Sequence, residues 1–105
     1  VFFFILLVLS LSQAQLTEVV NTDSGPVQGI VDSSNGLRKF LGIPYAAPPV
    51  LDLRFKSPVR PKPWSKVKTV AERGSACCQR LPTLQYIGQE DCLFLDVVTP
   101  PKVST

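Results

Sequence analysis

The chain has 105 residues, of which 45% are hydrophobic and 18% are charged, and its net charge is +3. This length is enough for one small domain or for part of a larger one. Histidine is absent from the sequence, and the cysteines and carboxylates have no metal-ligand spacing, so we predict no metal site and no cofactor.

The chain begins with an apolar run, Val1 to Leu9, that no charged segment precedes. Ser12-Gln13-Ala14 follows, with small residues at the two positions that determine cleavage of a secretory signal peptide. We interpret residues 1–14 as a signal peptide that is truncated at its amino terminus and cleaved between Ala14 and Gln15. A membrane anchor cut short is the alternative, but the run is too short to span a bilayer. The predicted location is extracellular or in the ER lumen.

Two turn signals divide the next part of the chain. Asp23-Ser24-Gly25-Pro26 and Ser33-Ser34-Asn35-Gly36 separate three strand candidates, at Thr17–Val20, Val27–Val31 and Leu37–Ile43. Asn-Gly accepts positive φ at low cost and favours a hairpin. The sequence therefore predicts a small antiparallel meander.

The segment from Pro44 to Trp64 is rich in proline. Proline lacks a backbone donor and has a fixed φ, so this segment is predicted to run extended over a surface, without a helix or central strand. The prolines are Pro44, Pro48, Pro49, Pro58, Pro61 and Pro63. A polyproline ligand for a signalling domain is the alternative, but those domains are mostly intracellular.

Most of the positive charge lies in or beside this segment, at Arg54, Lys56, Arg60, Lys62, Lys66, Lys68 and Arg73. A nucleic-acid-binding protein would interleave such charges with aromatic residues or place them on one helix face. Here only Phe55 and Trp64 interrupt the basic run. We expect a solvated surface and no nucleic-acid partner, with weak polyanion binding as the alternative.

An acidic pair and a cysteine, Glu90-Asp91-Cys92, introduce the last predicted strand. The following residues, Leu93 to Val98, are almost all apolar, with Leu93 and Leu95 on one face and Phe94 on the other. This pattern is typical of a strand that is covered on both faces.

Several motifs occur here in a family-specific order: Phe40 to Pro49 (FLGIPYAAPP), Leu53-Arg54-Phe55, Trp64 and Glu90-Asp91-Cys92. Together they resemble the amino-terminal region of the type-B carboxylesterases, the cholinesterase-like branch of the α/β-hydrolases. The resemblance implies an α/β fold of which only the amino-terminal part is present. Residues 15–105 would supply the small meander, the extended proline-rich segment, a disulfide loop and the first strand of the large sheet.

The resemblance also implies two links. Cys77 matches the half-cystine expected to bond Cys92, which would close a loop of about fifteen residues and contribute on the order of 3 kcal/mol. Bridges from Cys78 to Cys92 or between Cys77 and Cys78 are the alternatives. Cys78 is then expected to be a buried, inert thiol, with dimerisation through it as the alternative. Arg54 is expected to form a structural ion pair with Glu90.

Two departures from the family pattern bear on fold and substrate. Leu51 stands where a glycine usually precedes Leu-Arg-Phe, which costs on the order of 1 kcal/mol if the turn needs positive φ. The loop between Cys77 and Cys92 contains no tryptophan, whereas cholinesterases have a choline-stacking tryptophan in that loop. A choline esterase is therefore disfavoured.

Catalysis in this family needs a serine, a histidine, an acid and an oxyanion hole. The chain has no histidine and no Gly-Xaa-Ser-Xaa-Gly elbow, and Gly74-Ser75 has the wrong spacing. Glu90 and Asp91 are adjacent on an extended chain and should point to opposite faces, so they are not expected to act as an acid–base pair. We therefore predict no catalytic residue in this chain.

The predicted parent is a secreted serine carboxylesterase that acts on small-molecule esters, of which this part alone is inactive. A non-catalytic, cholinesterase-like adhesion protein is the alternative. A free-standing secreted binding module is a third possibility, which a single disulfide and a thin core disfavour.

Overall fold

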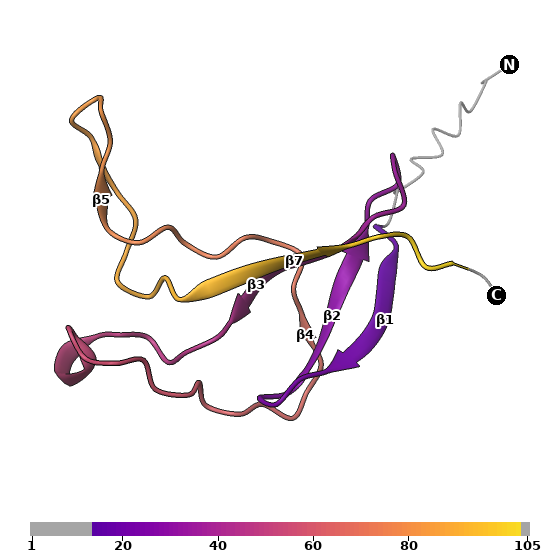
Figure 1. The fold of residues 1–105 in the computed structure, drawn as a ribbon, viewed down its shortest axis with the longest axis horizontal. Helices are drawn as coiled ribbons and strands as arrows, with labels where there is room; N and C mark the ends of the chain where they lie inside the picture. The colour runs from indigo at the N-terminus through magenta and orange to yellow at the C-terminus, as the bar shows by residue number, and fades with distance from the viewer. Residues whose placement is uncertain (1–13, 104–105) are drawn as a thin grey trace, which may run out of the picture.

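The computed structural model describes residues 14–103 (Figure 1). The predicted signal peptide, residues 1–14, therefore lies almost entirely outside the described residues. The elements are β1 (Leu16–Asn21), β2 (Pro26–Val31), β3 (Arg38–Pro44), the short 3₁₀ helix η1 (Leu51–Leu53), β4 (Lys68–Thr69), β5 (Gln79–Arg80), β6 (Tyr86–Ile87) and β7 (Phe94–Thr99).

The predicted antiparallel meander is confirmed, because β1 pairs with β2 and β2 with β3 in antiparallel register. The turn between β2 and β3 needs positive φ where the sequence places Asn-Gly, and Gly36 has a φ of 73°. Asp32 stabilises this turn: its carboxylate accepts hydrogen bonds from the Ser34 hydroxyl at 2.6 Å and from Lys39 Nζ at 2.5 Å. These bonds, the one from Lys39 foremost, lower the pKa of Asp32.

The last strand does not start a separate sheet. β7 pairs antiparallel with β3, so the sheet order is β1-β2-β3-β7. β4 runs parallel to the start of β2, at Val27 and Gln28, whereas β3 pairs with the end of β2, at Ile30 and Val31. β4 thus pairs with the part of β2 that does not pair with β3.

A β-bulge separates the two halves of β3. The register between β3 and β7 shifts between Phe40 and Ile43, where Gly42 has a φ of 74°. A side chain on Gly42 would collide with the carbonyl oxygen of Glu72. The bulge therefore requires glycine at this position of the family-like Gly-Ile-Pro sequence, because of both its positive φ and the close backbone contact.

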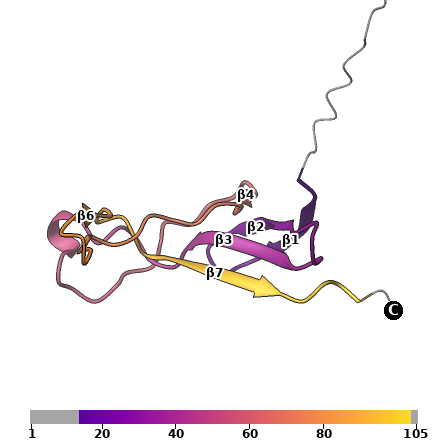
Figure 2. The same ribbon diagram turned by 90° about the horizontal axis from the view of Figure 1, so that it is seen from above.

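β7 differs from the prediction of a strand covered on both faces. Its inner four residues, Leu95 to Val98, are exposed, and η1 is the only helical element among residues 14–103. A strand with two apolar faces needs a layer packed on each. The described residues contain no such layers, so β7 forms an uncovered edge of the sheet (Figure 2).

A small core packs against one side of the meander. Val27, Phe40 and Val70 are buried, and Ile43 and Trp64 pack against them. Trp64 also fixes the extended segment to the β1–β2 turn, because its backbone N–H donates to the Ser24 carbonyl and its indole N–H to the Pro26 carbonyl, each at 2.9 Å. The tryptophan of the family motif is therefore both a core residue and an anchor.

The proline-rich segment runs extended, as predicted, except for one 3₁₀ turn at η1. Prolines lie on either side of this turn but not within it, so Leu53 and Arg54 are free to donate backbone hydrogen bonds to Val50 and Leu51. The prediction of no helix was therefore wrong for these three residues. In Figure 1 the η1 loop and the β5–β6 hairpin both project away from the sheet, and the described part extends over 70 × 44 × 25 Å.

Among residues 14–103, no helix is long and apolar enough to cross a membrane.

The first residue of η1, Leu51, has the positive φ for which the sequence predicts strain. Leu51 has a φ of 51° and is 84% exposed. A left-handed conformation costs a non-glycine residue roughly 1–2 kcal/mol, and here no burial of the side chain offsets it.

We predict that Leu51→Gly, in the longer protein that the resemblance implies, raises the free energy of unfolding by about 1 kcal/mol. Urea unfolding measures the effect. Asp52→Gly is the matched control, because Asp52 is exposed and its φ is not positive; the control should lower stability. Equal effects of the two substitutions would show that Leu51 is not strained.

Candidate functional site

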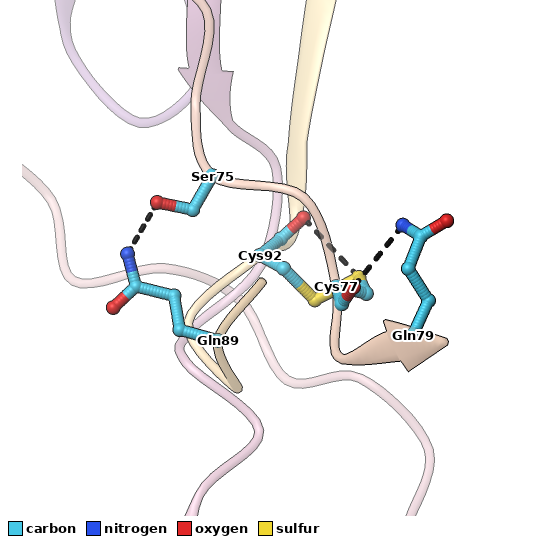
Figure 3. Close-up of a disulfide and its surroundings, with 5 residues drawn as sticks. All are labelled: Ser75, Cys77, Gln79, Gln89 and Cys92. Atoms are coloured by element: carbon cyan, nitrogen blue, oxygen red, sulfur yellow. Dashed lines mark hydrogen bonds between the residues drawn. A yellow bond between two sulfur atoms is a disulfide. The ribbon is translucent and has the colours of Figure 1, made fainter. Parts of the chain in front are cut away.

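Among the residues that the sequence singles out, the structure brings together one cluster, at the root of β7. Cys77 and Cys92 form a disulfide across a separation of 15 residues, with their Cα atoms 4.9 Å apart. Figure 3 shows this bridge between the loop that precedes β5 and the residues that lead into β7. The predicted pairing is confirmed, and the two alternative pairings are not formed.

Backbone contacts hold both sides of the bridge. Cys77 forms a parallel β-bridge with Gln89, whose N–H donates to the Ala76 carbonyl at 3.0 Å. The side chain of Gln89 bonds the Ser75 hydroxyl, as Figure 3 shows. Gly88 has a φ of 91°, and a side chain there would collide with the carbonyl oxygens of Ala76 and Cys77. The disulfide therefore closes a loop whose two ends are also held side by side by these hydrogen bonds.

The predicted partners Arg54 and Glu90 meet beside the disulfide. Arg54 Nε lies 2.7 Å from Glu90 Oε1, and the two side chains are 56% and 46% exposed. An ion pair with this much solvent contact contributes about 0–1 kcal/mol. Both residues line a shallow hollow together with Cys77 and Cys92. The ion pair and the disulfide together connect η1, the loop that precedes β5 and the residues that lead into β7.

Cys78 is a free cysteine and is exposed, which corrects the expectation of a buried thiol. Although Cys77 is bonded to Cys92, it is exposed as well, and Cys78 lines the same shallow hollow as the disulfide.

The acidic pair does not form a catalytic dyad. Glu90 faces the hollow that contains Arg54, whereas Asp91 lines a different hollow with Lys62 and Trp64. Within residues 14–103, no three His, Cys, Asp or Glu side chains are placed to hold a metal ion. The Ser34 hydroxyl donates to the Asp32 carboxylate, but this pair belongs to the β2–β3 turn. In the cluster at the root of β7, the hydroxyl of Ser75 is bound to the amide of Gln89, which is not a base. The cluster can therefore anchor segments but has no group that could activate a nucleophile.

Sequence reasoning missed one anchoring residue, Asp96. Its carboxylate accepts the N–H of Gly42 in the β3 bulge at 2.9 Å and lies 3.2 Å from Arg73 Nε. It thus satisfies a backbone donor that the bulge releases from the ladder. The signal was available in the sequence, because Asp96 is the only charged residue within an otherwise apolar strand.

The opposite end of the sheet has an apolar hollow between β1, β2, β3 and β7. Its lining includes Val20, Val27, Phe40, Ile43 and Val97. It has no charged group except Arg38, which is bound to Glu18 at 2.6 Å. The hollow is a packing surface and has no chemistry of its own.

Residues 16–105 match the model of the carboxylesterase family. Acylcarnitine hydrolase of Mus musculus is 37% identical over an alignment that covers 94% of this chain and 21% of that protein. Esterase E4 of Myzus persicae is 45% identical, with coverage of 83% and 16%.

Solved structures agree with this match. A PNB esterase has a TM-score of 0.71 and 36% sequence identity, and the matched region covers 88% of this chain and 18% of that structure. The chain therefore spans about one fifth of the length of the proteins that it matches. The structural neighbours are α/β-hydrolase esterases, and the β-rich arrangement found here is an amino-terminal part of their fold. The chain belongs to the carboxylesterase family.

Proposed function

We propose that this chain is the amino-terminal part of a secreted serine carboxylesterase that hydrolyses small-molecule carboxylic esters. The observation that carries the proposal is the family match over residues 16–105. The relatives named above are an acylcarnitine hydrolase and an esterase, and their names support an ester-hydrolysing parent over an adhesion protein.

The role of these residues in such an enzyme is that of a scaffold. A Ser-His-acid triad needs a histidine as general base, and this chain contains none. The longer protein would supply the serine, the histidine and the oxyanion hole. Residues 15–105 alone should therefore not hydrolyse esters.

Secretion is supported by two independent features. The apolar run Val1–Leu9 followed by Ser12-Gln13-Ala14 has the pattern of a signal peptide. The disulfide between Cys77 and Cys92 is stable in an oxidising compartment and rare in the cytosol.

The proposed role of the Arg54–Glu90 ion pair is to fix the η1 loop to the root of β7. Its exposure limits its direct contribution to stability, but it lies beside the disulfide and connects segments 36 residues apart in sequence. An anchor of this kind should act on folding and leave the chemical step unchanged.

Activity of the complete protein is the first test. We expect the full-length protein to hydrolyse p-nitrophenyl acetate and to be labelled by a fluorophosphonate. Replacement of its elbow serine by alanine should lower kcat by at least about 10³-fold. A full-length protein that folds but lacks the elbow or the histidine, and is not labelled, would support the adhesion protein instead.

The position of signal cleavage is the second test. Protein recovered from the medium of secreting cells is expected to begin at Gln15, which mass spectrometry of the amino-terminal peptide determines. A cell-associated protein that retains residues 1–14 would show that this segment is an anchor.

The ion pair is tested with Glu90→Gln, with Asp91→Asn as the matched control because no Arg or Lys lies within salt-bridge distance of Asp91 among the described residues. We expect Glu90→Gln to lower the yield of folded protein, while active-site titration gives an unchanged kcat per folded molecule. The double substitution Arg54→Glu with Glu90→Arg should restore part of the yield. Normal yield with slowed acylation would reject an anchoring role.

A further inference from the structure

The positive charge of the chain is concentrated in one short segment, residues 54–68, which we call the basic strip. The strip contains six of the eleven Lys and Arg residues and none of the eight Asp and Glu residues. The rest of the chain therefore has a net negative charge, with five basic and eight acidic side chains. All six cationic side chains of the strip are exposed: Arg54, Lys56, Arg60, Lys62, Lys66 and Lys68.

Four of these cations form neither a salt bridge nor a cation–π contact in the described part of the chain. Arg54 is bound to Glu90, and Lys68 lies 4.6 Å above the ring of Trp64. The remaining four, at positions 56, 60, 62 and 66, form no salt bridge with any described residue. Burial of several unpaired cations costs much free energy, so this strip should stay at the surface of the complete protein.

From residue 57 to residue 68 the backbone of the basic strip is held in a largely extended form, whereas Arg54 to Lys56 continue the turn of η1, where Phe55 has a φ of 60°. Val59 accepts the N–H of Ala47 at 3.0 Å, Trp64 is bound to the β1–β2 turn, and Lys68 and Thr69 pair with β2. Three prolines within the strip, Pro58, Pro61 and Pro63, prevent it from coiling into a helix. An extended chain rises about 3 Å per residue, so the free cations are spread along a line of up to about 30 Å.

A line of fixed, unpaired cations fits a linear polyanion. Because the backbone is already ordered, binding would lose little conformational entropy. We propose that the basic strip binds a sulfated polysaccharide. The proposal does not depend on esterase activity.

Three observations favour this polyanion over nucleic acid or an anionic membrane. The Cys77–Cys92 disulfide indicates an oxidising compartment, where nucleic acid is not the usual polyanion. Trp64 has its indole N–H and one ring face occupied, which leaves Phe55 as the only exposed aromatic ring of the strip for base stacking. The strip also has no amphipathic helix that could insert into a lipid surface.

The test measures the affinity of the full-length protein for immobilised heparin over a series of NaCl concentrations. Arg60→Ala with Lys66→Ala removes two free cations; Lys62 is left in place because Asp91 shares its hollow. The matched control, Arg80→Ala with Lys102→Ala, removes the same charge from exposed positions outside the strip. Unchanged circular dichroism and Tm verify that both variants fold.

We expect wild type and control to bind heparin with the same dependence on salt. For the strip variant, the slope of log Kd against log [NaCl] should be smaller by about two, one unit for each lost contact. Equal weakening of both variants would show an effect of net charge alone and reject a local site. Absence of binding at physiological ionic strength would also reject it. Equal affinity for duplex DNA or for phosphatidylserine vesicles would reject the polysaccharide as the specific ligand.

Discussion

The Cys77–Cys92 disulfide determines how the second half of this chain returns to the sheet. It joins the loop that follows β4 to the residues that lead into β7, so the β5–β6 hairpin is confined to the loop between its two ends. The ion pair of Glu90 with Arg54 and the backbone bond of Gln89 to Ala76 both lie next to this link. Loss of the disulfide would leave β7 attached mainly by its ladder to β3.

Two further anchors act on the same sheet from other directions. Trp64 binds the proline-rich segment to the β1–β2 turn and completes the small core with Val27 and Phe40. Asp96 binds the β3 bulge at Gly42 to β7. Each anchor consists of one side chain that satisfies a backbone group left free by a proline-rich stretch, a turn or a bulge. The fold of this region therefore depends on a few specific contacts more than on a large core.

The limited core also explains the shape of the molecule. Among residues 14–103, only four apolar side chains are buried, Val27, Phe40, Ala46 and Val70, and the middle of β7 is exposed. The proteins that this chain matches are about five times longer. The exposed apolar face of β7 agrees with the proposed role as a scaffold on which further layers of such a protein pack.

The sequence alone predicted the local features that depend on single residues or short motifs. Asn-Gly located the hairpin between β2 and β3, and the prolines predicted an extended segment. Leucine at position 51 predicted strain if the turn needs positive φ, and Leu51 has a φ of 51°. Family-like motifs also identified the partners Cys77 with Cys92 and Arg54 with Glu90. The turn and proline predictions succeed because these residues act on the backbone next to them. The two pairs were predicted because the family resemblance gives both partners of each pair.

Only the tertiary structure decided which segments share a sheet and which side chains are covered. β7 joins β3 through backbone hydrogen bonds, which no side-chain pattern specifies, and Asp96 gains its role from the bulge opposite it. Cys78 is exposed, since the loop that contains the disulfide is not covered by any other described segment. The apolar pattern of β7 predicts covering layers that residues 14–103 do not contain. Hydrophobic patterning determines that a face is to be buried, but the partner that buries it is fixed by chain topology.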